Sequence, residues 1–353
     1  MEAIVLYQKY LDNASEVVNS QHRSAFLNNL GLAYAALGDT KKAIEFYEQA
    51  LEIERKDGWH RDETVTLGHL GNAHAGFGEV IRAIEYNEQA LVIARGNGER
   101  RGEGNALNNL GNRYAELGDL QKALEFHKKA LLIRRQVNNK YEEAYTLSNI
   151  GLDLLGLEDF QRARDICLRA FQLAVDISNY AVQLEAYLGL TQIYLFQNDL
   201  INARATIEAA LQYDVPQINH NASTLHGIIA LRQGDGNTAR QALTRANAQA
   251  DEILAKTPEY YDALDAKGLA LCGLLIVDWR LKIDDEQKTA DGVADDGQRS
   301  TVYRQQAIET FRAARKIAPH AGIVKSVLRL FDELAKCDED GVLKDVRNAA
   351  EGK

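Results

Sequence analysis

Proline is scarce in this sequence, which has only three in 353 residues. Because proline breaks helix interiors, whereas the abundant Leu, Ala, Glu and Gln favour them, the composition predicts a nearly all-helical protein. Long hydrophobic runs are missing too. The longest, Gly268 to Val277, is far shorter than the roughly 20 residues that a membrane-spanning helix needs. The N-terminus carries Glu2 and Lys9 within its apolar pattern, unlike a signal peptide, so we expect no membrane partner.

The sequence also has few cysteines and no cluster of positive charge. The three cysteines, Cys167, Cys272 and Cys337, lie far apart and lack CxxC spacing. This excludes a disulfide framework, disfavours a zinc site and fits a reducing cytoplasm, where we expect the protein to be located. The chain has 41 Lys and Arg against 51 Asp and Glu, with no basic stripe. Because nucleic-acid binding is driven by clustered basic charge, we expect no nucleic-acid partner.

Motifs for catalysis or nucleotide binding are absent as well. The sequence has no GxxxxGK(S/T), HExxH or GxSxG motif, and its eight histidines are scattered. The stretch GNGERRGEG at 96–104 superficially resembles a dinucleotide fingerprint, but no strand pattern precedes it, so we interpret it as a turn. The sequence therefore predicts a protein that is not an enzyme and has no cofactor and no metal.

What the sequence does contain is a repeat with a period of 40 residues. An acidic residue marks the same turn in five copies: Asp39, Glu79, Asp119, Asp159 and Asp199. Small and apolar positions recur at the same step, namely Leu30, Leu70, Leu110, Ile150 and Leu190, then Gly31, Gly71, Gly111 and Gly151, and then Ala43, Ala83, Ala123, Ala163 and Ala203. This regularity predicts an array of similar structural units.

Each copy contains the apolar spacing of two amphipathic helices. In the first copy, Leu27, Leu30 and Tyr34 follow helical spacing, and Ala43 and Tyr47 do so in the second helix. Small Gly and Ala positions are needed where two helices approach closely. The sequence LGD at 37–39 separates the helices, with a glycine suited to a left-handed helix end and an aspartate suited to cap the next helix.

This pattern resembles the tetratricopeptide repeat family, over about residues 21–255. The matching residues are Leu30, Gly31, Tyr34, Ala43, Tyr47 and Ala50, with their copies. The resemblance implies an all-α fold, a right-handed superhelical solenoid of antiparallel helix pairs. The period of 40 departs from the usual 34 residues and the proline expected near each repeat end is missing, as in the longer-helix branch that includes kinesin light chains and mitotic-orientation scaffolds.

The same register predicts the organisation of the whole chain. Residues 1–20 align with the second helix of a repeat, so they are either an N-terminal cap or, as we favour, part of a longer array. Residues 21–255 hold six repeats, and 256–318 hold a degenerate repeat with an acidic loop at 284–300. Residues 319–353 are expected to form capping helices, because the end of a solenoid must be covered.

Asparagines are unusually dense in the first helix of repeat three. Asparagine costs roughly 0.5 kcal/mol relative to Ala in a helix because its amide competes for backbone hydrogen bonds. With Leu107 set to zero, Asn108, Asn109 and Asn112 lie at roughly 100°, 200° and 140°, away from the core of their own repeat. In the family that this sequence resembles, the same face lines an inner, concave groove where partners bind as extended or helical peptides.

These positions give the candidate binding residues. We predict that a protein or peptide segment contacts Asn28, Asn29, His69, Asn72, Asn108, Asn109, Asn112, Glu116 and Asn149. An asparagine amide offers both a donor and an acceptor, so a row of them can hold a peptide backbone whatever its side chains. Two alternatives remain: a hydrogen-bonded network between neighbouring helices, or a merely solvated face, although Glu, Lys or Gln would make such a face at less cost.

The predicted function is a non-catalytic interaction module that binds a protein segment in the groove of repeats one to four. Two alternatives follow from the resemblance. One is the ligand-sensor region of a bacterial STAND-type NTPase, whose nucleotide-binding part would lie upstream, so that these residues alone would not bind or hydrolyse ATP. The other is a bacterial receptor that binds a signalling peptide.

Overall fold

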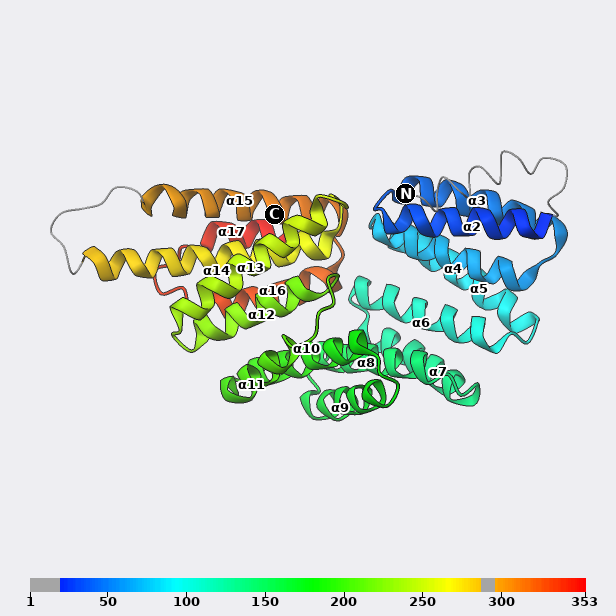
Figure 1. The fold of residues 1–353 in the computed structure, drawn as a ribbon, viewed down its shortest axis with the longest axis horizontal. Helices are drawn as coiled ribbons and strands as arrows, with labels where there is room; N and C mark the ends of the chain where they lie inside the picture. The colour runs from blue at the N-terminus through cyan, green and yellow to red at the C-terminus, as the bar shows by residue number, and fades with distance from the viewer. Residues whose placement is uncertain (1–19, 287–295) are drawn as a thin grey trace. The chain divides into compact units, whose positions relative to one another are not determined.

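The computed structural model describes residues 20–286 and 296–353, and Figure 1 shows that this part of the chain is built from α-helices. Sixteen helices, α2 to α17, and no strand are found among these residues. They form two compact units, unit 1 (Met1–Thr146) and unit 2 (Leu147–Lys353). The predicted orphan helix at 1–20 lies almost wholly outside the described residues.

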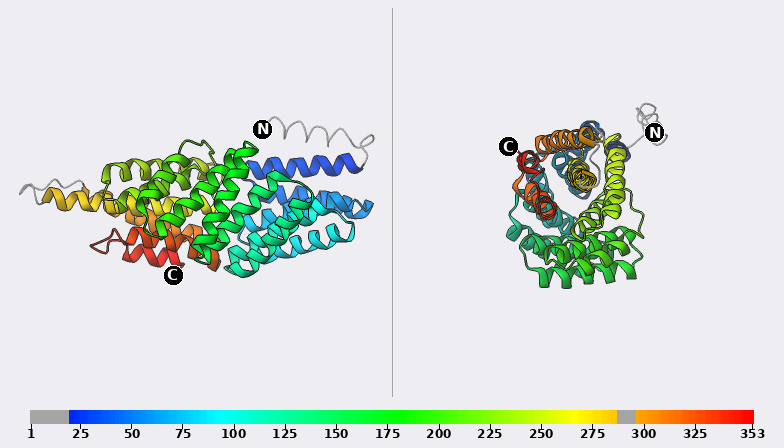
Figure 2. Two further views of the ribbon diagram at one scale, coloured as in Figure 1. Left: turned by 90° about the horizontal axis from the view of Figure 1, so that it is seen from below. Right: turned by 90° about the vertical axis from the view of Figure 1, so that its left-hand side faces the viewer.

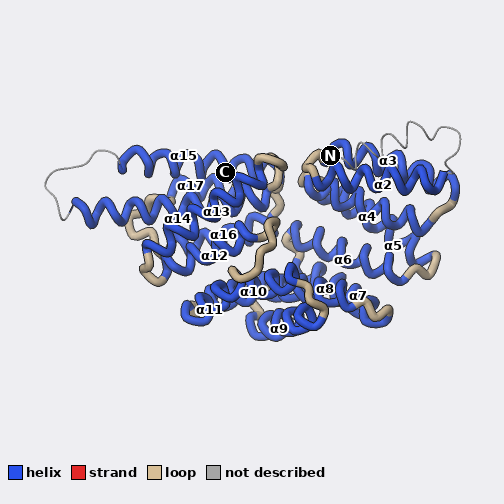
Figure 3. Tube along the Cα trace, in the orientation of Figure 1, coloured by secondary structure: helices blue, strands red, loops and turns tan. Residues whose placement is uncertain are grey.

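Unit 1 is a stack of antiparallel helix pairs. Its pairs are α2 with α3, α4 with α5, and α6 with α7, and the second helix of the first two pairs also packs on the first helix of the next pair (Figure 3). The helices are α2 (Ser20–Ala36), α3 (Thr40–Asp57), α4 (His60–Gly76), α5 (Val80–Gly96), α6 (Arg100–Leu117), α7 (Leu120–Gln136) and the beginning of α8 (Lys140–Gly156).

Unit 2 continues the pairing through α14 and α15. The C-terminal helices then depart from it: α16 packs on both α12 and α14, while α17 packs on α15, and Figure 2 shows these two helices in orange to red. After the rest of α8, its helices are α9 (Phe160–Asp176), α10 (Tyr180–Phe196), α11 (Leu200–Ala210), α12 (Asn219–Arg232), α13 (Gly236–Leu254), α14 (Tyr261–Glu286), α15 (Asp296–Ile317), α16 (Ala321–Ala335) and α17 (Lys344–Glu351).

The acidic loop expected at 284–300 lies only partly within the described residues. Helix α14 continues to Glu286 and α15 begins at Asp296, so only 287–295 lie outside the described residues. The long helices pack along each other.

The turns repeat as regularly as the helices. A residue with left-handed φ occurs at every twentieth position from 38 to 198: Gly38, Gly58, Gly78, Gly98, Gly118, Asn138, Glu158, Ser178 and Asn198. Glycine adopts this conformation without the steric cost that a Cβ brings. The capping role predicted for Asp39 is confirmed, because its carboxylate accepts a hydrogen bond from the backbone N–H of Lys42 at 3.2 Å.

Close helix approach explains the conserved spacing of glycines within the first helices. A Cβ built at Gly31 would lie 2.3 Å from Tyr47 of the paired helix, and one at Gly111 would lie 2.4 Å from His127. The predicted fold class, an all-α solenoid of antiparallel helix pairs, is thus confirmed. Among the described residues, no helix is both long and apolar enough to cross a membrane.

The left-handed turns yield a test of stability. Ser178 has φ 56°, so Ser178→Gly should raise the free energy of unfolding by about 0.5 to 1 kcal/mol. Gly98→Ser, at φ 66° with no atom within 4 Å of the new Cβ, should lower it by a similar amount. Glu158→Gly should gain less, because Glu158 pairs with Arg329 at 2.9 Å. Urea denaturation followed by circular dichroism measures all three, and a destabilised Ser178→Gly would contradict the strain argument.

Candidate functional site

The first helices of unit 1 carry a recurring set of accessible positions. Helices α4 and α6 pack directly on each other, more closely than the second helices α5 and α7 do, which places α4 and α6 on the inner side of this stack. Helix α2 holds the equivalent position in the preceding repeat. We define the inner face as the positions of these helices that remain exposed or half-buried at four-three-four spacing: Ala25, Asn29, Leu32, Ala36, Val65, His69, Asn72, Gly76, Asn105, Asn109, Asn112 and Glu116.

Two of the predicted binding residues present free amides on this face. Asn29 and Asn72 are exposed, and neither forms a hydrogen bond with another described residue. His69 lies between them in sequence and stacks on Tyr47, with 5.2 Å between the ring centroids. Burial lowers the pKa of His69, so its imidazole is neutral at pH 7 and can offer one donor and one acceptor.

Two further amides belong both to the inner face and to the packing between helices. The Asn109 amide donates to the side-chain oxygen of Asn87 at 3.3 Å, and the Asn112 oxygen lies 3.1 Å from Nε2 of His127. Both side chains are half-buried. An amide group offers both donors and an acceptor, and these bonds fix the orientation of the two side chains. Glu116 is also half-buried on this face.

Asn28 and Asn108 point elsewhere, which corrects part of the predicted site. Asn108 is only 4% exposed, and its oxygen lies 3.4 Å from both Arg134 and Thr146. The Asn28 amide donates to Glu54 at 2.9 Å and to Thr66 at 2.7 Å. At 100° around the helix, these side chains face the next repeat rather than solvent. We therefore remove Asn108 from the candidate site and assign Asn28 to the inter-helix network.

Asn149 stands apart from the other predicted residues. It lies on the part of α8 that belongs to unit 2, is half-buried and already has its own interactions. The structure therefore gathers Asn29, His69, Asn72, Asn109, Asn112 and Glu116 on unit 1, and Asn149 is described separately.

Two buried charged side chains, Glu54 and Arg134, were not predicted from the sequence. Glu54 is 0% exposed and accepts hydrogen bonds from Ser24 and Asn28. Burial raises the pKa of the Glu54 carboxyl. The equivalent residue two repeats later is Arg134, 4% exposed, whose guanidinium Nε lies 3.3 Å from Glu142. The equivalent residue in the repeat between them is Ala94. A charged residue at a position that is otherwise small was therefore the sequence signal for these buried charges.

A second missed feature is a repeated ion pair at each boundary between repeats. Arg55, Arg95 and Arg135 reach the glutamates eight residues later, with N–O distances of 2.9, 2.9 and 2.8 Å. The glutamates, Glu63, Glu103 and Glu143, are 6%, 7% and 6% exposed. A second basic side chain, from His60, Arg100 or Lys140, lies beside each carboxylate. The Arg and Glu recur every 40 residues, and this register fixes the spacing of the inner face.

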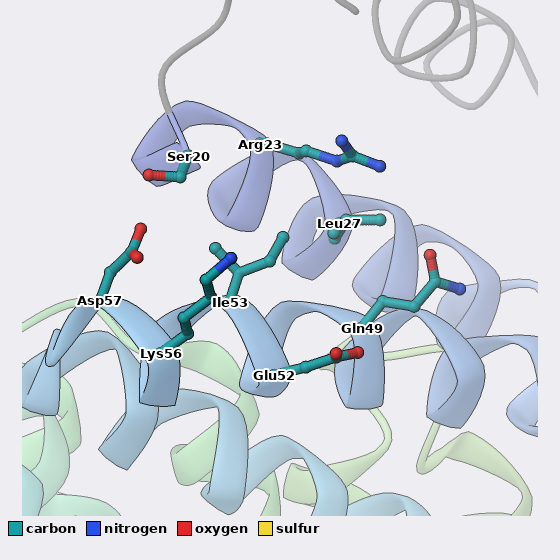
Figure 4. Close-up of a pocket in the computed structure, with 8 residues that line it drawn as sticks. All are labelled: Ser20, Arg23, Leu27, Gln49, Glu52, Ile53, Lys56 and Asp57. Atoms are coloured by element: carbon teal, nitrogen blue, oxygen red, sulfur yellow. The ribbon is translucent and has the colours of Figure 1, made fainter.

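A separate pocket of about 540 Å³ lies between α2 and α3 (Figure 4). Its lining residues are Ser20, Arg23, Leu27, Gln49, Glu52, Ile53, Lys56 and Asp57, none of which was predicted to bind a partner. Among the described residues, no group of three or more His, Cys, Asp or Glu side chains could hold a metal ion. Burial raises the pKa of Cys167 to about 12, so its thiol is not a reactive thiolate at neutral pH.

Stacked antiparallel helix pairs with a fixed period define a helical-repeat protein. Two models described as the tetratricopeptide repeat match residues 24–57 and 62–136. Residues 24–57 and 62–136 are therefore tetratricopeptide repeats. No curated protein matches the sequence.

Solved structures share this fold at low sequence identity. BtubC from P. vanneervenii is 19% identical, with a TM-score of 0.51 over 61% of this chain and 92% of its own. A Rap protein complexed with competence and sporulation factor is 15% identical, with a TM-score of 0.57 over 94% and 80%. The Rap conjugation gene regulator of plasmid pLS20, in complex with a peptide, is 16% identical, with a TM-score of 0.57 over 72% and 70%. Such identities show likeness of fold alone.

The buried Glu54 leads to a prediction about pH. Because its pKa is raised above the ordinary 4.5, folding favours its protonated form, and this group lowers stability as pH rises from 4.5 through its folded pKa. Glu54→Gln keeps an oxygen for Ser24 and Asn28 but carries no charge. Urea titrations at pH 4 and 7 should show that Glu54→Gln is at least as stable as wild type at pH 7, with a smaller loss between the two pH values.

The matched control is Glu54→Ala. It leaves the donors of Ser24 and Asn28 without their buried acceptor and should cost about 1 to 3 kcal/mol at pH 7. If Glu54→Gln were as damaging as Glu54→Ala, the ionised carboxylate itself would be required and the burial argument would fail.

Proposed function

We propose that this protein is a non-catalytic interaction module and that the inner face of unit 1 binds a segment of a protein or peptide in extended conformation. The observation that carries the proposal is the pair of exposed amides, Asn29 and Asn72. Each occupies a helix position where Ala, Glu or Lys would be more stable, and neither is used within the described structure.

The chemistry of this face suits a peptide backbone. An extended segment presents N–H and C=O groups that secondary structure does not satisfy, and asparagine can pair with both. Asn109 and Asn112 lie on the same face and are held by Asn87 and His127. Side chains fixed in advance lose less conformational entropy on binding. Both the free and the held amides therefore favour recognition of backbone groups.

A receptor for a free signalling peptide is the more specific candidate. Two similar folds, both Rap proteins, are described in complex with competence and sporulation factor and with a peptide. Such a receptor would bind a free peptide better than the same sequence within a longer chain, whereas an adaptor would bind both alike. The other alternative, the ligand sensor of a STAND-type NTPase, would use the same inner face.

The proposal is tested by selecting short peptides from a random display library with the purified chain. Affinities of the selected peptides can then be measured by fluorescence anisotropy. Asn29→Ala/Asn72→Ala should weaken binding by about 1 to 3 kcal/mol for each hydrogen bond left unmade, while folding stability stays unchanged or rises because Ala is the better helix former.

The control removes two exposed side chains from the second helices, Glu85→Ala/Glu125→Ala, and should leave affinity unchanged. A chain that selects no peptide, or whose selected peptides bind equally well to Asn29→Ala/Asn72→Ala, would overturn the proposal. The variant Asn109→Ala/Asn112→Ala distinguishes peptide binding from packing as the role of these two amides. If it lowers folding stability but not peptide affinity, the amides serve packing between helices.

A further inference from the structure

A row of exposed side chains adjoins the inner face one helical turn toward the helix N-termini. Arg61 on α4, Arg101 on α6 and Tyr141 on α8 occupy equivalent positions at 40-residue steps, and all three are exposed. Tyr141 is 62% exposed, and Val65, one turn after Arg61, is 49% exposed. Arginine and tyrosine are among the side chains that most often anchor protein interfaces.

The two arginines have no anionic partner in the described structure. Neither Arg61 nor Arg101 forms a hydrogen bond or an ion pair with a described residue, although the chain as a whole carries a net charge of −10. Of the carboxylates in the same first helical turns, Glu63 and Glu103 are already used, whereas Asp62, beside Arg61 in the sequence, forms no ion pair with a described residue. Glu63 is held by Arg55 and His60. Glu103 is likewise neutralised by two arginines of its own, Arg95 and Arg100.

The amides of the inner face therefore lie beside two cations that form no ion pair with a described residue. Packed helices lie about 8 to 10 Å apart. An extended chain rises about 3.3 Å per residue, so neighbouring first helices are spanned by about three residues. A guanidinium binds a carboxylate through two parallel hydrogen bonds, which makes the pair directional as well as attractive.

We propose that the segment bound by the inner face is acidic, with carboxylates about two to three residues apart that pair with Arg61 and Arg101, and with apolar or aromatic side chains of which one packs on Val65 and another, further along the segment, packs on Tyr141. This inference rests on the function proposed above and specifies its partner. An acidic peptide suits the site better than a nucleic acid, because the dense phosphate charge would be repelled by the remaining acidic surface.

The composition of peptides selected from the random display library tests this directly. The wild-type chain should enrich Asp and Glu, and Arg61→Gln/Arg101→Gln should lose that enrichment. The most acidic selected peptide should bind Arg61→Gln/Arg101→Gln at least about tenfold more weakly, a difference that shrinks at high salt. The matched control, Lys41→Gln/Lys128→Gln, removes the same charge from exposed positions on the second helices and should bind like wild type.

The outcomes separate this inference from the proposed function. Neutral or basic peptides that depend on Asn29 and Asn72 but not on the arginines would overturn the acidic partner and leave the proposed function in place. Peptides that depend on neither pair would overturn both. A fluorescent oligo-dT probe that bound more tightly than the acidic peptide, with the same dependence on Arg61 and Arg101, would assign the cations to phosphate and overturn the inference.

Discussion

The stack of unit 1 depends on one interaction repeated at each boundary between repeats, a buried glutamate held by an arginine from the preceding helix. A carboxylate buried without partners would destabilise the boundary, so each cation must occupy one position relative to the next repeat. Because this contact sets the register between second and first helices, it also sets the spacing of every side chain on the inner face. The buried Arg–Glu ion pairs between repeats therefore set the spacing of the accessible amides and of the arginines beside them.

Asparagines of the first helices take part in packing at one position and remain accessible at another. Asn108 is sealed between helices beside Arg134, whereas Asn72 is exposed and free of internal bonds. The difference arises from angle around the helix rather than residue type. A side chain at about 100° around the helix from the core leucine contacts the first helix of the next repeat. One at about 140° to 200° lies on the accessible inner face. An asparagine-rich helix therefore contains a structural network and a candidate binding surface side by side.

Buried charge also distinguishes repeats that are otherwise alike. Glu54 and Arg134 occupy equivalent positions with opposite charge, yet the same asparagine and threonine positions lie beside both: Asn28 and Thr66 at one boundary, Asn108 and Thr146 at the other. An asparagine amide can donate to a carboxylate through its nitrogen and accept from a guanidinium through its oxygen, so one side chain suits either charge. Ser24, which donates to Glu54 and has Gly104 as its counterpart, is specific to the carboxylate boundary.

The sequence by itself determined the helices, the turns and the repeat, because each is encoded locally. Apolar spacing, Gly38 and Asp39 recur at fixed steps, and the structure places a left-handed turn and an aspartate cap where they predict them. Which polar side chains remain accessible was decided only by tertiary structure. A helical wheel separates Asn108 from its own core but carries no information about the next repeat, which packs over it. The partners of Glu54, Glu63 and Arg134 likewise come from other helices, so their pairing required the stack to be assembled.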